Sequence, residues 1–174
     1  MPRLIRLELI GAAFMIALGS ALHFLFGWSG NWPPVALIAA VNESIWEHLK
    51  IAFWPGVVWA LLAPYPQAIR GWPLFAAKGV GLMVCATTIV LVFQSYTTIL
   101  GKNLLALDIG TFAFSILVGQ LISAWLLARQ PRLLPLGIPV LVLLFLAFSL
   151  LTYAPPDHWL FTDARTGTQG IPVR

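Results

Sequence analysis

Long apolar runs recur along almost the whole chain, and they restrict its fold more than any other feature. Hydrophobic residues make up 60% of the 174 positions, whereas charged residues make up only 9%. A run of about 20 apolar residues is long enough to cross the hydrocarbon core of a bilayer as a helix. Repeated runs of this kind with short polar breaks between them predict a helical integral membrane protein.

Five segments are predicted to cross the bilayer. The breaks between them are short and rich in glycine and proline, as in GWSGNWPP and APYPQAIRGWP, which favours turns between neighbouring helices. The apolar stretch VALIAAV is too short to cross, so we expect it to lie at the interface or to dip in and return. The predicted fold is an all-α, polytopic membrane helical bundle that forms one transmembrane domain over residues 1–174. The predicted spans cover about residues 7–26, 43–62, 75–96, 104–127 and 134–153, and an outer-face tail covers 154–174.

The distribution of lysine and arginine predicts the orientation of this bundle. With five spans, the side that carries the N-terminus holds six of the ten basic residues, and basic residues favour the cytoplasmic side. The N-terminus is therefore predicted inside and the C-terminus outside. The basic residues are scattered singly between apolar runs, so the net charge of +4 does not indicate a nucleic-acid-binding surface. In this topology the outer face gathers all three histidines and five of the six acids: His23, His48, His158, Glu43, Glu47, Asp108, Asp157 and Asp163.

The stretch VNESIWEHLK, residues 41–50, places an unusual density of charge at the head of the second span. The apolar part that follows, residues 51–62, would be only about 18 Å long as a helix, whereas the hydrocarbon core is about 30 Å thick. The helix can complete a crossing only by extending backward through Glu47, His48 and Lys50. Charged side chains at that depth are expected to face the bundle interior, and they are candidates for function.

A structural role for part of this stretch stays open. Asn42 is a suitable N-cap, and Ser44 with Glu47 fits a capping box, so a helix start explains one or two of the polar residues. It does not explain His48 and Lys50, which come later.

Other segments supply possible partners for this charged head. His23 shares a helical stripe with small residues, which allow helices to approach closely in membranes. Asp108 lies about one turn inside the fourth span, and Gln94 lies near the outer end of the third. The tail carries His158 and three large apolar residues, so it can fold back over the bundle as a lid or remain a disordered terminus.

The segment ALHFLFGWSGNWPPVALIAAVNESIWEHLK resembles a family of small bacterial integral membrane proteins that carry an N-E-S-x-W-E-H-L-K signature. The resemblance extends to ALDIGTFAFSILVGQ and, more loosely, to FTDARTGTQG. The function of that family is unknown, so the resemblance implies a bacterial cytoplasmic membrane but no activity. The residues that fit its pattern are His23, Asn42, Glu43, Ser44, Trp46, Glu47, His48, Lys50 and Asp108.

These residues lead to a hypothesis of a metal-dependent membrane hydrolase that acts on an amphiphilic substrate at the outer face. The expected cofactor is zinc or another divalent metal. The expected metal ligands are His23, Glu43, His48 and, with less support from its position, His158. The expected catalytic residues are Glu47, Lys50 and Asp108, supported by Asn42, Ser44, Trp46 and Gln94.

Two alternatives remain at this point. The same Glu47, Lys50 and Asp108 could form the site of a small-solute or ion carrier, although such a carrier needs polar residues across the whole bilayer. The protein could also be an assembly factor with a purely structural polar cluster. The expected partners are the lipid bilayer and a lipid-like or small polar ligand, without nucleic acid, and the sequence does not indicate an oligomeric state.

Overall fold

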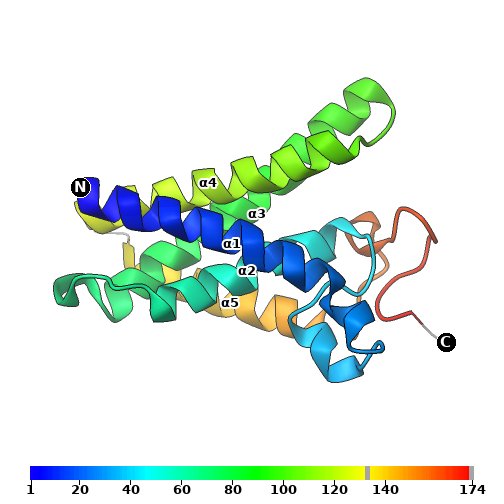
Figure 1. The fold of residues 1–174 in the computed structure, drawn as a ribbon, viewed down its shortest axis with the longest axis horizontal. Coiled ribbons are helices and arrows are strands. Elements are labelled where there is room, and N and C mark those ends of the chain that lie inside the picture. Colours follow the sequence, from blue (N-terminus) through cyan, green and yellow to red (C-terminus); the bar gives the residue numbers. More distant parts are fainter. Residues whose placement is uncertain (132–133, 173–174) are drawn as a thin grey trace.

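The structure is a computed structural model that describes residues 1–131 and 134–172 (Figure 1). Its long helices are α1 (Pro2–Trp28), α2 (Ile45–Leu62), α3 (Trp72–Leu100), α4 (Leu105–Arg129) and α5 (Gly137–Leu150). Four short 3₁₀ helices join or follow them: η1 (Pro33–Leu37), η2 (Gln67–Ile69), η3 (Leu134–Leu136) and η4 (Trp159–Phe161). Within the described residues the only β-bridge is the isolated pair Thr162–Gln169. The predicted all-α class is confirmed, and each long helix lies within a few residues of a predicted span.

Among the described residues, three helices are long and apolar enough to cross a membrane, by length and composition. They are α1, α3 and α4, with 27, 29 and 25 residues. The other two long helices are shorter: α2 has 18 residues and α5 has 14. The length and apolar composition of α1, α3 and α4 indicate a membrane protein.

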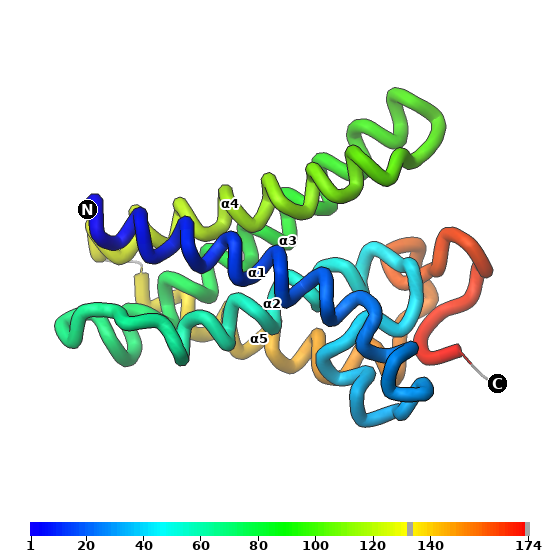
Figure 2. The backbone as a smooth tube through the Cα atoms, in the orientation of Figure 1, coloured from blue at the N-terminus to red at the C-terminus, as the bar shows by residue number. Residues whose placement is uncertain are grey.

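The helices run side by side along the long axis of the molecule, and α3 contacts α2, α4 and α5 (Figure 2). The N-terminus lies at one end. The η1 segment, the start of α2 and the C-terminal tail gather at the opposite end, and the hairpin between α3 and α4 projects from the bundle there (Figure 1). The residues that the sequence analysis singled out in VNESIWEHLK therefore share one end of the bundle with the tail.

Small residues bring the helices into close contact. A Cβ atom at Gly81 of α3 would lie 2.6 Å from the carbonyl oxygen of Gly119 in α4, and one at Gly119 would lie 2.5 Å from that of Gly81. On α1, a Cβ atom at Gly19 would lie 2.8 Å from the carbonyl oxygen of Ile51 in α2. Larger residues would push these helices apart, as expected where helices associate through small-residue contacts.

A buried polar network lies near the N-terminal end of the bundle. Lys78 Nζ of α3 is 2.5 Å from Glu8 Oε2 of α1 and donates a hydrogen bond to Gln120 Oε1 of α4 at 2.9 Å. Tyr65 Oη donates to the other oxygen of Glu8 at 2.8 Å. The sequence analysis did not pair Glu8 with Lys78, because residues 70 positions apart on different helices give no spacing signal.

The segment between α1 and α2 turns into the protein. Ala36 and Ala39 are fully buried, and Val41 is 7% exposed. They pack with Phe26 of α1 into a small apolar cluster. The stretch VALIAAV therefore packs against the end of the bundle at which α2 begins, and its position relative to a membrane stays a prediction.

Candidate functional site

Helix α2 begins within the charged stretch VNESIWEHLK. Ser44 is its N-cap, and the Ser44 hydroxyl accepts a hydrogen bond from the backbone N–H of Glu47 at 3.4 Å. Asn42 is not the N-cap. Its side-chain oxygen accepts from the backbone N–H of Ser44, and its side-chain amide donates to the carbonyl of Gly170 in the tail, each at 2.9 Å. The start of α2 is thereby tied to the end of the chain.

Glu47 and Lys50 form a closed network inside the bundle, as predicted, whereas His48, for which the same position was expected, stays partly exposed. Lys50 is 0% exposed and Glu47 is 1% exposed. Lys50 Nζ lies 2.5 Å from Glu47 Oε2 and donates to the Ala36 carbonyl at 2.7 Å and to Thr152 Oγ1 at 2.9 Å. Thr152 donates in turn to Glu47 Oε1 at 2.8 Å, and the Val41 N–H donates to Glu47 Oε2 at 3.1 Å. Every ammonium hydrogen has a partner, so this network pins η1 and the end of α5 to α2.

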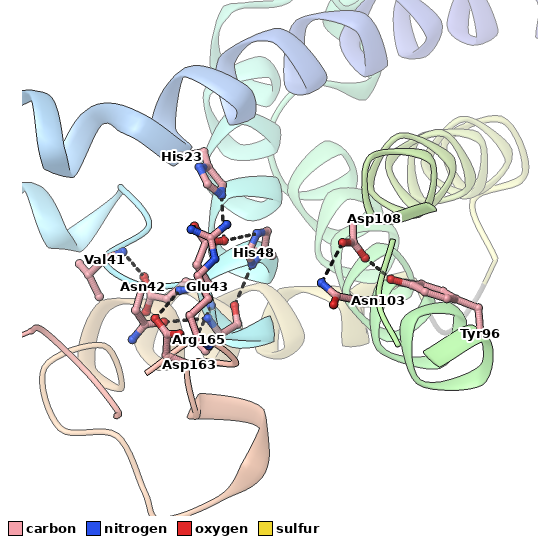
Figure 3. Close-up of polar contacts among 12 residues, drawn as sticks. His23, Val41, Asn42, Glu43, His48, Tyr96, Asn103, Asp108, Asp163 and Arg165 are labelled. Atoms are coloured by element: carbon pink, nitrogen blue, oxygen red, sulfur yellow. Dashed lines mark hydrogen bonds and ion pairs between the residues drawn. The ribbon is translucent and has the colours of Figure 1, made fainter. Parts of the chain in front are cut away.

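A second group of side chains from the same stretch stays open to the surface (Figure 3). Nε2 of His23 on α1 lies 3.5 Å from Glu43 Oε2, and Nε2 of His48 on α2 lies 3.8 Å from the same oxygen. The two imidazole rings are 5.2 Å apart. One potential ligand atom from each of His23, Glu43 and His48 lies within 4.8 Å of the other two, and the three residues are only partly buried. The site could hold a metal ion.

The hydrogen bond of His48 fixes which of its nitrogens is available. His48 Nδ1 lies 2.8 Å from the carbonyl oxygen of Ser44, one turn earlier. A carbonyl only accepts, so Nδ1 carries the hydrogen and the lone pair of the neutral ring is on Nε2, which faces Glu43. A backbone carbonyl that orients an imidazole in this way is typical of histidines that bind metals.

The C-terminal tail folds back over this cluster, as the sequence allowed. Asp163 Oδ2 accepts from the backbone N–H of Glu43 at 3.0 Å, and Oδ1 accepts from the N–H groups of Arg165 at 2.6 Å and Thr166 at 3.1 Å. Burial raises the pKa of Asp163, but these three backbone donors outweigh it and the net pKa lies below the ordinary value. The turn places an Arg165 guanidinium nitrogen 3.4 Å from Glu43 Oε1.

His23 and Glu43 also line a surface pocket of about 370 Å³. Its other walls are mostly apolar, formed by the end of α1, the segment before α2 and the tail. These walls are Phe24, Phe26, Gly27, Asn31, Ala40, Val41, Asn42 and Pro172. The cluster thus lies where a polar group and an apolar surface meet.

Several residues expected at the site lie elsewhere among the described residues. Asp108 accepts hydrogen bonds from Tyr96 Oη and, at 3.4 Å, from Asn103 Nδ2, in a separate group on the projecting hairpin (Figure 3). His158 is exposed, and its Nδ1 accepts from the N–H of Leu160 at 3.3 Å. Gln94 is exposed on α3.

Trp46, expected as a supporting residue, lies beneath the cluster in the apolar core. Its ring centroid is 4.7 Å from that of Phe148 in α5 and 4.6 Å from that of Phe161 in the tail. It therefore supports the site by holding the tail and α5 against the first turns of α2.

Sequence reasoning missed Thr152 and Arg165, which shape this end of the molecule, and it placed Asp163 on the same face without predicting its contact with Glu43. The pattern Asp-Ala-Arg-Thr-Gly does contain a signal, because aspartate side chains accept hydrogen bonds from N–H groups two or three residues later in turns. That signal predicts the turn. It does not show that the turn docks on Glu43, some 120 residues earlier.

The chain belongs to DUF6512. This is a family of unknown function, and its profile matches residues 3–171, which include every residue of the cluster. The expectation of an uncharacterised family is confirmed. The chain matches no curated protein and no solved structure.

Proposed function

We propose that this DUF6512 protein is a membrane-embedded, metal-dependent hydrolase that acts on an amphiphilic substrate at the outer face. The observation that carries the proposal is the spacing of His23, Glu43 and His48. Ligand atoms bound at about 2.1 Å around a tetrahedral zinc ion lie about 3.4 Å from one another. The two Nε2-to-Oε2 distances of 3.5 and 3.8 Å are close to that edge length.

The same distances fit direct hydrogen bonding less well. A charge-assisted hydrogen bond between imidazolium and carboxylate is about 2.7–2.9 Å long. Both Nε2 atoms lie well beyond this range from Glu43, yet both face the same oxygen. Two imidazoles held around one carboxylate oxygen at ligand-to-ligand spacing support a shared cation.

Two imidazoles and one carboxylate are a ligand set of catalytic zinc sites, which leave the fourth position to water. A zinc ion in such a site lowers the pKa of bound water to about 7 and makes it a nucleophile at neutral pH. No further carboxylate with free oxygens contacts the described cluster, since Asp163 accepts three backbone hydrogen bonds. The proposal therefore assigns no separate general base.

The remaining expected site residues receive other roles in this proposal. Glu47 and Lys50 are positioning residues, because both are buried and hold η1 and α2 together beneath the cluster. Asp108 and His158 lie outside the ligand set, since each has its own partners. The ligand set is thus His23, Glu43 and His48.

The proposal includes the topology in which all five long helices cross a bacterial cytoplasmic membrane, with the N-terminus inside and the C-terminus outside. The position of the N-terminus and of the tail, described as far as residue 172, at opposite ends of the bundle supports it (Figure 1). Because the native Cys85 is buried in α3, we expect it to react little with a maleimide, so labelling reports the introduced cysteine. A cysteine placed at Thr168 should react with an impermeant maleimide on intact cells, and one placed at Arg3 should not; the reverse pattern would overturn the orientation.

Elemental analysis of the purified protein tests the metal. Purification without chelators is expected to yield about one zinc or other divalent ion per chain. His48→Ala should lose most of the metal and Lys102→Ala, a change at an exposed residue of the α3–α4 turn, should keep it. A wild-type protein without stoichiometric metal, even after incubation with zinc, would overturn the proposal.

One observation favours a carrier as a second candidate. The Glu8–Lys78–Gln120 network places buried charge at the end of the bundle opposite the His–Glu–His cluster. Polar groups near both ends are what a transported ion or proton would need. If Glu8→Gln abolishes ion-driven uptake into liposomes while metal binding is unchanged, the carrier replaces the hydrolase as the better account.

A further inference from the structure

We infer that the site recognises a phosphate group on its amphiphilic substrate, and that Arg165 of the tail is the residue that selects it. This inference rests on the metal site proposed above. It goes further, because it assigns a chemical class to the substrate and a binding role to a residue outside the ligand set.

The position of Arg165 is fixed through the backbone. The two oxygens of Asp163 join the N–H of Arg165 to the N–H of Glu43, so the tail turn and the ligand-bearing segment move as one unit. The Arg165 side chain nevertheless makes a single contact, from one guanidinium nitrogen to Glu43 Oε1 at 3.4 Å, and is 75% exposed. A residue with an anchored backbone and a mostly exposed guanidinium, held by one long ion pair, is suited to binding an anionic ligand.

The local charge favours an anion. With neutral histidines, Glu43 contributes one negative charge, whereas a divalent ion and Arg165 contribute three positive charges. The site would then carry a net charge of about +2 on the outer face, which attracts anionic groups. The geometry adds selectivity, because the planar guanidinium matches phosphate oxygens in a paired arrangement, and a phosphate ester has oxygens left to face the cation.

The pocket beside the cluster explains why the phosphate should be attached to a lipid-like group. The wall next to His23 and Glu43 includes Phe24, which is 55% exposed, and Phe26 and Ala40, which are buried beneath the surface. An apolar chain lying on this wall would leave its phosphate head group between Arg165 and the cation. A free phosphate compound in water would gain nothing from that wall.

Binding to the zinc-loaded protein in detergent tests the inference, with calorimetry as the readout. The probes are inorganic phosphate, short-chain phosphatidic acid and the matching diacylglycerol. Phosphatidic acid should bind more tightly than inorganic phosphate, and diacylglycerol should not bind measurably. Arg165→Ala should weaken phosphatidic acid binding by about 10-fold or more, the range expected for lost hydrogen bonds to a charged group, while Lys102→Ala changes it little. Arg165→Lys should recover only part of the loss, because lysine lacks the paired donors.

Metal content measured on the same samples separates the two proposals. If Arg165→Ala keeps its metal but binds phosphatidic acid as well as the wild type, the phosphate inference is wrong and the metal site stands. Equal affinity for phosphatidic acid and inorganic phosphate would overturn the lipid-like substrate. If the wild type holds no metal and binds neither phosphate probe, the proposed function itself fails and this inference fails with it.

Discussion

The decapeptide VNESIWEHLK supplies two charged groups that behave in opposite ways. Glu47 and Lys50 point into the bundle, are almost fully buried and have every hydrogen-bonding group paired. Glu43 and His48 lie at the surface of the same end, about a quarter to a third exposed, and meet His23 and Arg165 at distances too long for strong hydrogen bonds. One sequence stretch therefore makes both a closed network and an open cluster.

The difference shows how charge in an apolar protein can be divided between folding and chemistry. A buried ion pair with all its partners in place specifies how the surrounding segments meet, and it has no free group with which to bind a ligand. In the open cluster, Nε2 of His23 and Nε2 of His48 face the same oxygen of Glu43, and the shape of the cluster depends on the segments that the closed network holds. The two groups should therefore respond differently to mutation.

Breaking the closed network should have the largest effect on stability. Lys50→Met removes one partner and leaves Glu47 charged in a dry site, which costs about 3–5 kcal/mol of the free energy of unfolding. Unfolding in detergent, followed by denaturant titration, measures the loss. The double variant Glu47→Gln/Lys50→Met should recover part of it, because no uncompensated charge remains. A Lys50→Met protein as stable as the wild type would contradict the structural role.

Removing a ligand from the open cluster should cost metal affinity rather than stability. His48→Ala is expected to weaken zinc binding by more than the 10–100-fold that loss of an outer-shell partner typically causes. Because the His48 side chain is 33% exposed, the free energy of unfolding without metal should change by less than about 1 kcal/mol. Zinc titration and unfolding of the metal-free protein separate the two effects. A His48→Ala protein with a much lower free energy of unfolding but unchanged zinc affinity would show that His48 has a structural role and is not a metal ligand.

Acid should release the tail from the open cluster. The folded-state pKa of Asp163 lies below its ordinary value of 3.8, so its contribution to docking is present above that value and is lost as the pH falls through the lower folded-state pKa. Between pH 6 and pH 2, the protection factors of the Glu43 and Arg165 amides in metal-free protein, which correct for the intrinsic pH dependence of hydrogen exchange, should fall about 10-fold or more, given the strength of hydrogen bonds to charged groups.

Asp163→Asn provides the control for that acid effect. It should show the low protection factors already at pH 6, and they should change little on acidification. Asp157→Asn, an exposed tail residue, should behave as the wild type. Protection of the Glu43 amide that survives in Asp163→Asn would mean that other contacts hold the tail.

Substitution of Asp108 is expected to have the smallest effect on zinc affinity and on the free energy of unfolding. Its contacts are with Tyr96 and Asn103 on the projecting hairpin, apart from the cluster (Figure 3). Asp108→Asn should leave zinc affinity unchanged within about twofold, and the free energy of unfolding should fall by about 1 kcal/mol or less. A 10-fold loss of zinc affinity would bring Asp108 back into the site.

The sequence predicted the features that depend on local pattern. Apolar runs located all five helices, and the shortness of residues 51–62 predicted the burial of Glu47, His48 and Lys50, which holds for Glu47 and Lys50 but not for the partly exposed His48. Pairings between distant segments could not be predicted in the same way. The contact of Glu43 with Asp163 and of Glu8 with Lys78 depends on how whole helices and the tail meet, and no spacing along the chain encodes it.

The expected site residues show the same division. His23 and His48 were both placed at the outer face, and that placement was enough to suggest a shared site. Asp108 is predicted on the same face by the same argument, yet its contacts are with Tyr96 and Asn103 on the α3–α4 hairpin, apart from the cluster (Figure 3). Topology gives the face on which a residue lies, but not its lateral position on that face.

Zinc K-edge X-ray absorption of the purified protein tests the central claim most directly, because it reports the atoms bound to the ion. The account expects one ion per chain with two imidazole nitrogens and oxygen ligands at about 2.0–2.2 Å. One imidazole should disappear from the spectrum in His23→Ala or in His48→Ala. An ion with no imidazole ligands, or a spectrum that neither variant changes, would show that His23, Glu43 and His48 do not share a metal.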